Sequence, residues 1–252
     1  TINCFIPYAD AQQVQATVDG LRQNALVTKI FLLATDANAA AVEGCEVINI
    51  DALNSSATMK KIAAATEGDY TLLYTKYNNL VMGYLALERM VRLAGDSKAA
   101  MVYADNYQIV EGKKSNAPVI DYQFGSLRDD FNFGSVLFFC TKALKAAAAE
   151  IDVEYTAAGL YDLRLKVSRQ GDLVHINEYL YTEIALPVAS EGESHFSYVD
   201  PKNRGVQIEM EQACTDHLKK IGGYLEPKFE EINFNQGDFE YEASVIIPVR
   251  NR

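Results

Sequence analysis

Cations, cysteine pairs and long apolar runs are all scarce in this chain of 252 residues. Lys and Arg number 23 against 34 Asp and Glu, which gives a formal net charge of −11. This charge repels polyanions, so nucleic acid is not an expected partner. No apolar run approaches the ~18 residues that span a bilayer, and the N-terminal TINCFIPYAD lacks the basic start and apolar stretch of a signal peptide. We therefore expect a cytoplasmic protein.

Few residues suit metal or redox chemistry. The four cysteines lie far apart without a Cys-x-x-Cys pair, which argues against zinc ribbons and predicts buried thiols in a reducing compartment. With 15 Gly and 6 Pro the chain is neither collagen-like nor of low complexity. The Rossmann and P-loop glycine motifs are absent. His175, His195 and His217 have no His partner at helical spacing, so no histidine metal site is expected, and we expect His217 at a helix interface.

The chain does contain an alternation of strand and helix patterns. Apolar runs predict strands at residues 2–6, 29–35, 47–50, 70–74 and 99–103. Helical spacing predicts helices at 14–26, 58–66 and 81–93. This order predicts a mainly parallel sheet covered by helices on both faces, with a ligand beyond the carboxyl ends of its strands. The candidate residues at those ends are Pro7–Asp10, Thr35–Asp36, Thr75–Asn79 and Asp105–Asn106.

The second half is less regular and ends in a repeated pattern. We expect strands at 136–140 and 174–181, and helices at 142–149, 159–168 and 205–224. An acidic, Asn-rich stretch after Pro227 is typical of a linker. The sequence VIIP at 245–248 then repeats the CFIP of residues 4–7. This ending is either an edge strand that tolerates Pro248 or, as the pattern favours, the start of a second copy of the same unit.

Several segments in order resemble the family-2 glycosyltransferases. The strand that closes in Pro, at 2–7 and again at 245–248, is similar to the family's opening. The other matching segments are FLLATDAN (31–38), SSATMKKIAAATEGDYTLLY (55–74), AMVYADNYQI (100–109), YDLRLKVSRQG (161–171) and INEYLYTEIAL (176–186). The resemblance covers about residues 1–190, and residues 195–225 resemble the link that joins two such domains in bacterial two-domain members.

The resemblance implies an α/β fold of the GT-A, Rossmann-like type, with a mainly parallel sheet flanked by helices and a C-terminal helical extension. It implies a glycosyltransferase-like domain at 1–190, a connecting helix and linker at 191–242, and the first strand of a truncated second domain at 243–252. The implied activity is transfer of a hexose from a nucleotide-diphosphate sugar to the hydroxyl of a saccharide or lipid-linked acceptor. The second glycosyltransferase domain of the same chain is an implied partner.

The family's nucleotide-sugar site maps onto two groups of residues. Pro7 and Tyr8 align with the wall of its nucleobase pocket, and Asp36 aligns with the second of its paired acids. An ordinary turn or N-cap role is the alternative for Asp36. The residues Thr75, Lys76 and Tyr77 stand where the family has the Asp-x-Asp turn that binds a divalent metal. Lys76 either neutralises the phosphate charge in place of a metal or is simply a solvated side chain.

Because two carboxylates are missing from that turn, we assign no metal ligands and no definite cofactor. The resemblance leaves Mg²⁺ or Mn²⁺ as an open alternative for the case that activity is retained. Gly159-Leu160 replaces the acidic pair that usually carries the general base. Asp105 and Asp162 remain as catalytic candidates, with a turn acid and a helix-holding acid as their alternatives. The adjacent Asp129 and Asp130 are either solvated or contact an acceptor. Two functions follow from this degenerate site: a transferase, or a non-catalytic binding or scaffold domain that supports a catalytic second domain.

Overall fold

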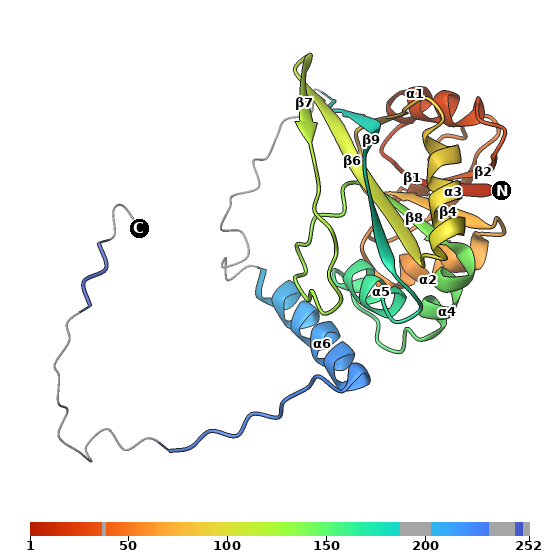
Figure 1. Ribbon diagram of the computed structural model, residues 1–252. Coiled ribbons are helices and arrows are strands. Elements are labelled where there is room, and N and C mark those ends of the chain that lie inside the picture. The colour runs from red at the N-terminus through yellow and green to blue at the C-terminus, as the bar shows by residue number, and fades with distance from the viewer. Residues whose placement is uncertain (37–38, 187–202, 232–244, 249–252) are drawn as a thin grey trace.

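The computed structural model describes residues 1–36, 39–186, 203–231 and 245–248. Its centre is a nine-stranded sheet with the order β3-β2-β1-β4-β8-β6-β9-β5, and β7 pairs with β6 beside that path (Figure 1). The strands are β1 (Ile2–Tyr8), β2 (Val27–Ala34), β3 (Glu46–Asn49), β4 (Tyr70–Tyr74), β5 (Asn79–Met82), β6 (Met101–Val110), β7 (Lys113–Ala117), β8 (Val136–Cys140) and β9 (Leu173–Ile184). The first four strands in that order pair in parallel, as do β6 and β9.

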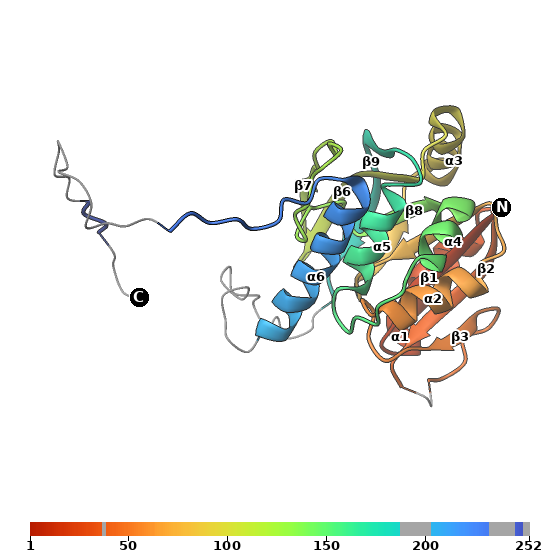
Figure 2. The same ribbon diagram turned by 90° about the horizontal axis from the view of Figure 1, so that it is seen from below.

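Helices cover both faces of the sheet, as the alternating pattern predicted (Figures 1 and 2). The described helices are α1 (Ala11–Arg22), α2 (Ser56–Ala65), α3 (Ala86–Ser97), α4 (Thr141–Ala149), α5 (Gly159–Val167) and α6 (Arg204–Ile221). One hydrophobic core joins the sheet to α1 and α3, and the other joins it to α2, α4 and α5. Strand β1 is buried along its whole length, because its two faces contribute to these two cores.

Two strands run further than the sequence predicted. We expected β1 to close at Pro7, but parallel pairing continues to Tyr8, where β1 has β2 on one side only because its pairing with β4 ends at Phe5. A proline is tolerated there because no ladder bond from its nitrogen is needed. The prediction that β6 stops before Asp105 is also wrong, since the strand continues to Val110 and forms a hairpin with β7.

The helix expected at 81–93 begins five residues late. Val81 and Met82 belong to β5, which pairs antiparallel with β9, and Gly83 donates its amide to the carbonyl of Leu180 at 2.8 Å. A Cβ at Gly83 would lie 2.9 Å from that carbonyl oxygen, so the close approach requires glycine. Leu85 then adopts a left-handed conformation with φ 53°, and α3 starts at Ala86. Val81 and Met82 therefore form a strand because they pair with β9, although their spacing also fits a helix.

The C-terminal region contains one long helix that packs onto the domain. Helix α6 lies against α5, where Ala213 is buried with Tyr161 and Leu165 (Figure 2). Residues 245–248 are exposed and have no strand assignment, so a second domain beginning there stays a prediction. Among the described helices, none combines the length and apolar character needed to cross a membrane.

Candidate functional site

The carboxyl ends of β1, β2 and β4 meet at one edge of the sheet because the three strands are parallel. Asp10 follows β1 and caps α1, since its side chain accepts a hydrogen bond from the amide of Gln13 at 2.8 Å. The buried Gln13 side chain donates to the carbonyl of Tyr77 at 2.9 Å and so ties the loop after β1 to the loop after β4. Asp36 follows β2 at the same edge and is exposed.

The turn after β4 is fixed by its neighbours. Thr75 donates its amide and its hydroxyl to the carbonyl of Ser135, at 2.9 and 3.2 Å. The ammonium of Lys76 lies 2.9 Å from Glu183, a buried carboxylate on β9 that also accepts from the Ser135 hydroxyl. Tyr77 is 41% exposed, and partial burial raises the pKa of its hydroxyl. The charge of Lys76 is therefore already compensated by Glu183.

Beside this turn lies an open cleft of about 530 Å³. Thr75 and Lys76 form one side, and the loop that carries Asp129 and Asp130 forms another. Phe131, Phe133, Tyr161, Arg164 and Met210 also line the cleft. The cleft thus combines carboxylates, a cation and aromatic faces. These groups suit a ligand with hydroxyls and an anionic part.

Arg164 on α5 is the cation that sequence reasoning missed. Arg164 is 4% exposed, and its guanidinium donates to the carbonyls of Ser126 and Arg128, at 3.0 and 2.6 Å. It also lies over the rings of Tyr161 and Phe133. Burial lowers the pKa of Arg164, but a guanidinium stays charged at neutral pH. No carboxylate of the described residues forms an ion pair with it.

The two acids of the cleft differ in their surroundings. Arg128 donates to both carboxylate oxygens of Asp130 at 2.8 Å, and this hydrogen bonding lowers the pKa of Asp130. The carboxylate of Asp129 accepts only the amide of Asp130, at 3.1 Å, among the bonds of the described residues. Within the described part of the chain, Asp129 is therefore the cleft carboxylate that forms no ion pair with a cation.

Glycine is required at two positions around the cleft. Gly134 has φ +73°, and a Cβ there would lie 2.3 Å from the hydroxyl of Tyr181. At Gly159, the first residue of α5, a Cβ would lie 2.1 Å from the amide nitrogen of Ser56. The backbone of α2 therefore leaves no room for a side chain at 159, where the family resemblance implies an acid.

Asp105 lies outside this cleft. It is 2% exposed within β6 and accepts the amide of Val119 at 2.9 Å. Nε2 of His175 lies 2.9 Å from its carboxylate, and Nδ1 of the same ring lies 2.7 Å from the exposed Asp121. These contacts hold residues 119–121 against the sheet.

Asp162 also faces a different space. It is buried on α5 and pairs with Lys166, and burial raises the pKa of its carboxyl group. Together with Arg169 and His217 it lines a hollow of about 90 Å³ between α5 and α6. The expectation that His217 lies at a helix interface is confirmed. His195 lies outside the described residues.

The turn after β4 does not fit a divalent metal. A hard cation prefers carboxylate and carbonyl oxygens, whereas this turn offers the hydroxyls of Thr75 and Tyr77 beside the ammonium of Lys76. Within the described residues, His, Cys, Asp and Glu side chains form no group of three that could hold a metal ion.

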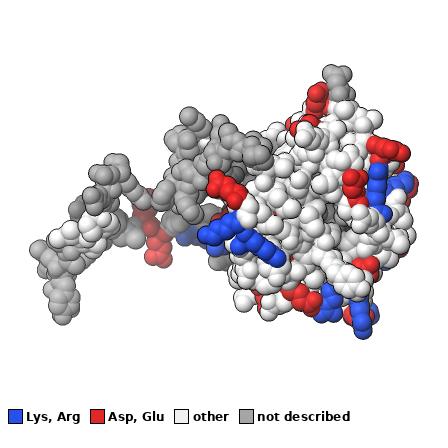
Figure 3. All heavy atoms as spheres, turned by 90° about the horizontal axis from the view of Figure 1, so that it is seen from above, with Lys and Arg blue, Asp and Glu red and all other residues white. Residues whose placement is uncertain are grey.

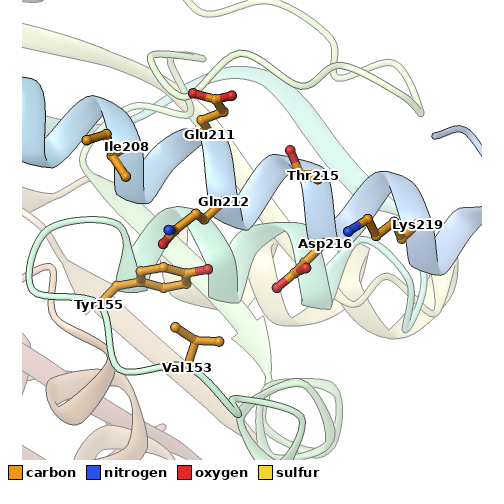
Figure 4. Close-up of a pocket in the computed structure, with 8 residues that line it drawn as sticks. All are labelled: Val153, Tyr155, Ile208, Glu211, Gln212, Thr215, Asp216 and Lys219. Carbon is orange, nitrogen blue, oxygen red and sulfur yellow. The ribbon is translucent and has the colours of Figure 1, made fainter. Parts of the chain in front are cut away.

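A second hollow lies along α6, as Figure 4 shows. It is a shallow groove of about 580 Å³ between α6 and the segment that carries Val153 and Tyr155. None of the residues predicted for the site lines it. On the described part of the face in Figure 3, Lys and Arg side chains are dispersed and do not form a single basic patch.

No protein-family model and no curated protein matches the chain. Among solved structures, S. aureus TarS 1–349 in complex with UDP-GlcNAc has a TM-score of 0.55 at 10% identity, covering 86% of this chain and 71% of that one. The complex of TarS 1–349 with UDP has a TM-score of 0.54 at 10% identity, covering 89% and 72%. The chain covers 60% of a third TarS 1–349 structure, at 8% identity and a TM-score of 0.54. The chain therefore has the GT-A glycosyltransferase fold that the resemblance implied.

Proposed function

We propose that this chain binds a nucleotide-diphosphate sugar at the carboxyl edge of its sheet and transfers the sugar to a hydroxyl acceptor. The observation that carries the proposal is the cleft beside β4, which Arg164 and Asp129 both line. The GT-A fold supports it, because structures of TarS with this fold hold UDP-GlcNAc and UDP. The nucleobase is assigned to the carboxyl ends of β1 and β2, where Pro7, Tyr8 and Asp36 lie.

Arg164 supplies the positive charge that a departing diphosphate needs. A guanidinium binds phosphate oxygens through parallel N–H donors. Lys76 adds a second ammonium at the cleft, although Glu183 already compensates it. No step passes through a metal, because the turn at 75–77 does not fit one. We therefore expect binding that does not depend on Mg²⁺ or Mn²⁺.

In the transfer itself, the bond between the anomeric carbon and the diphosphate oxygen breaks, and the leaving nucleoside diphosphate keeps the electron pair. The acceptor oxygen forms the new bond to that carbon, and its proton passes to a base. We assign this base to Asp129, the carboxylate of the cleft without a cation partner. This assignment replaces Asp105 and Asp162, which face other spaces.

Calorimetric titration of the 252-residue chain with UDP, UDP-GlcNAc and other nucleotide-diphosphate sugars tests the proposal. Each titration is made with EDTA and with Mn²⁺. Binding of at least one of these ligands with unchanged affinity in EDTA is the expected result. If none of the panel binds under either condition, the function is wrong for this chain.

A non-catalytic binding or scaffold role is the alternative. The lack of metal ligands after β4 and the absence of space for an acid at Gly159 favour it. In that case ligand binds but UDP is not released from UDP-GlcNAc at a rate above the buffer blank. A rate of UDP release that falls in the Asp129→Asn variant would exclude this alternative.

A further inference from the structure

Helix α6 supplies the carboxylate that caps the N-terminus of α5. Oε1 of Glu209 accepts hydrogen bonds from the amide and the hydroxyl of Thr156, at 3.1 and 2.7 Å. Oε2 accepts the amides of Ala157 and Ala158, at 2.8 and 3.0 Å. Burial raises the pKa of Glu209, but these hydrogen bonds outweigh it and the net shift is downward. The carboxylate is therefore ionised at the positive end of the α5 dipole.

Helix α5 has no capping group of its own. Its N-cap residue, Ala158, makes no side-chain hydrogen bond. Gly159 cannot be replaced by a larger residue, because the backbone of Ser56 lies too close. The amides before α5 would be left without partners if Glu209 were removed, and buried amides without partners are costly. An acid about 50 residues later in the chain therefore holds the three residues that precede α5, whereas the local caps of α1 and α2 accept an amide of the helix's own first turn.

Helix α5 in turn holds the outer wall of the cleft. The hydroxyl of Tyr161 donates to the carbonyl of Leu127. Arg164 donates to the carbonyls on either side of it, those of Ser126 and Arg128. Three successive carbonyls are thus fixed from one helix, immediately before Asp129.

Helix α6 also contributes to the cleft directly. Met210, the neighbour of Glu209, lines the cleft beside Ala157 and Leu160. Helix α6 therefore contacts the residues before α5 through Glu209 and lines the cleft through Met210.

We propose that α6 is a wall of the ligand cleft and that Glu209 is a positioning residue, which acts on the ligand through α5 and residues 126–129. The effect on ligand binding rests on the proposed nucleotide-sugar function. The effect on the shape of the cleft does not, because it is carried by contacts within the chain. The two parts can therefore be tested separately.

The test compares Glu209→Ala and Glu209→Gln with Glu211→Ala in the full 252-residue chain. Glu211 is a matched control, because it is an exposed acid on the same helix and lines only the outer groove (Figure 4). The first measurement is amide hydrogen exchange without ligand, in peptides that cover 156–165 and 126–134. The second is calorimetric titration with UDP-GlcNAc, and the third is thermal unfolding.

We expect faster exchange in both peptides for Glu209→Ala, and a loss of UDP-GlcNAc affinity of roughly 10-fold or more. Glu209→Gln keeps one acceptor oxygen and should recover part of both effects. Glu211→Ala should match the unaltered chain. Comparing the change in exchange rate at 126–134 with that at 156–165 separates a positioning role of Glu209 from a local loss of stability.

Faster exchange at 156–165 alone, with 126–134 and the affinity unchanged, would overturn the proposal, because Glu209 would then be only a local cap. A lower melting temperature with both peptides protected as before would overturn it as well. If the unaltered chain binds none of the nucleotide sugars, the proposed function fails. The exchange at 126–134 still decides whether Glu209 shapes the cleft.

Discussion

Acid should weaken the attachment of α6 through one buried histidine. His217 is 3% exposed, and its Nδ1 lies 3.2 Å from a guanidinium nitrogen of Arg169. The pKa of His217 is lowered to about 4. Burial is the largest cause, and the positive charges of Arg169, Arg164 and Lys166 lower this pKa further. The ring is therefore neutral in the folded protein at pH 5, whereas it is protonated in the unfolded chain.

The sign and size of the effect follow from these two pKa values. The folded pKa is depressed from the ordinary 6.5, so the unfolded state binds the extra proton between pH 6.5 and pH 4. The contribution of His217 to stability is present above pH 6.5 and is lost as the pH falls. Linkage gives a loss of about 2 kcal/mol by pH 5 and about 3 kcal/mol by pH 4.

Urea denaturation at pH 7.5, 6 and 5 measures this loss against a His217→Gln variant, whose amide oxygen can still accept from Arg169. The comparison is needed because other groups of the same hollow also titrate. Burial raises the pKa of Asp162, so its protonation stabilises the fold as the pH falls and opposes the histidine. If the free energies of unfolding of the two proteins fall in parallel from pH 7.5 to pH 5, the argument from burial is refuted.

Four further substitutions, one of them a control, test the cleft and the packing beneath it. Gly159→Ala should destabilise the fold by about 3 kcal/mol in urea denaturation, because its Cβ would lie 2.1 Å from the amide nitrogen of Ser56. In the control Gly205→Ala the new Cβ meets nothing within 4 Å, and this change should stabilise α6 by up to about 1 kcal/mol. Equal changes in the free energy of unfolding of the two variants would contradict this prediction. Arg164→Met should weaken UDP-GlcNAc binding by roughly 10- to 100-fold in calorimetry. Unchanged affinity would show that Arg164 does not bind the diphosphate. Asp129→Asn should keep that affinity but slow UDP release by roughly 100-fold or more, so an unaltered rate would place the base elsewhere.

The parallel core of the fold could be predicted because its strands are buried on both faces. Such strands are continuous apolar runs, as in YTLLY at 70–74, and the predicted bounds of β4 agree with the structure. The failure at residues 81–85 has a physical cause. LVMGYLALERM fits a helix by spacing, but β9 lies where it can pair with Val81 and Met82. Local pattern cannot reveal a partner about 100 residues away.

The cleft residues named from the sequence are Asp129 and Asp130, for which a solvated role was the alternative, and two residues that follow the end of a parallel strand. The rule that ligands bind at such strand ends selected Thr75 and Lys76, and both line the cleft. It could not select Arg164, because a cation three residues after Tyr161 in a helix pattern looks like part of a solvated face. Its burial depends on the carbonyls of Ser126 and Arg128, which are far from it in sequence. A cation between leucines, as in LRL at 163–165, is the one signal that the sequence offers.

An activity test must include helix α6, because this helix contributes to the cleft. The sequence predicted a helix at 205–224, but not the surface against which that helix packs. In the structure Glu209 accepts the amides of Ala157 and Ala158, and Met210 lines the cleft, so one side of the cleft depends on residues 204–221. A fragment cut at the expected boundary of residue 190 would leave the amides of Ala157 and Ala158 without their acceptor. Loss of binding by such a fragment would then report a missing wall and not a domain without function.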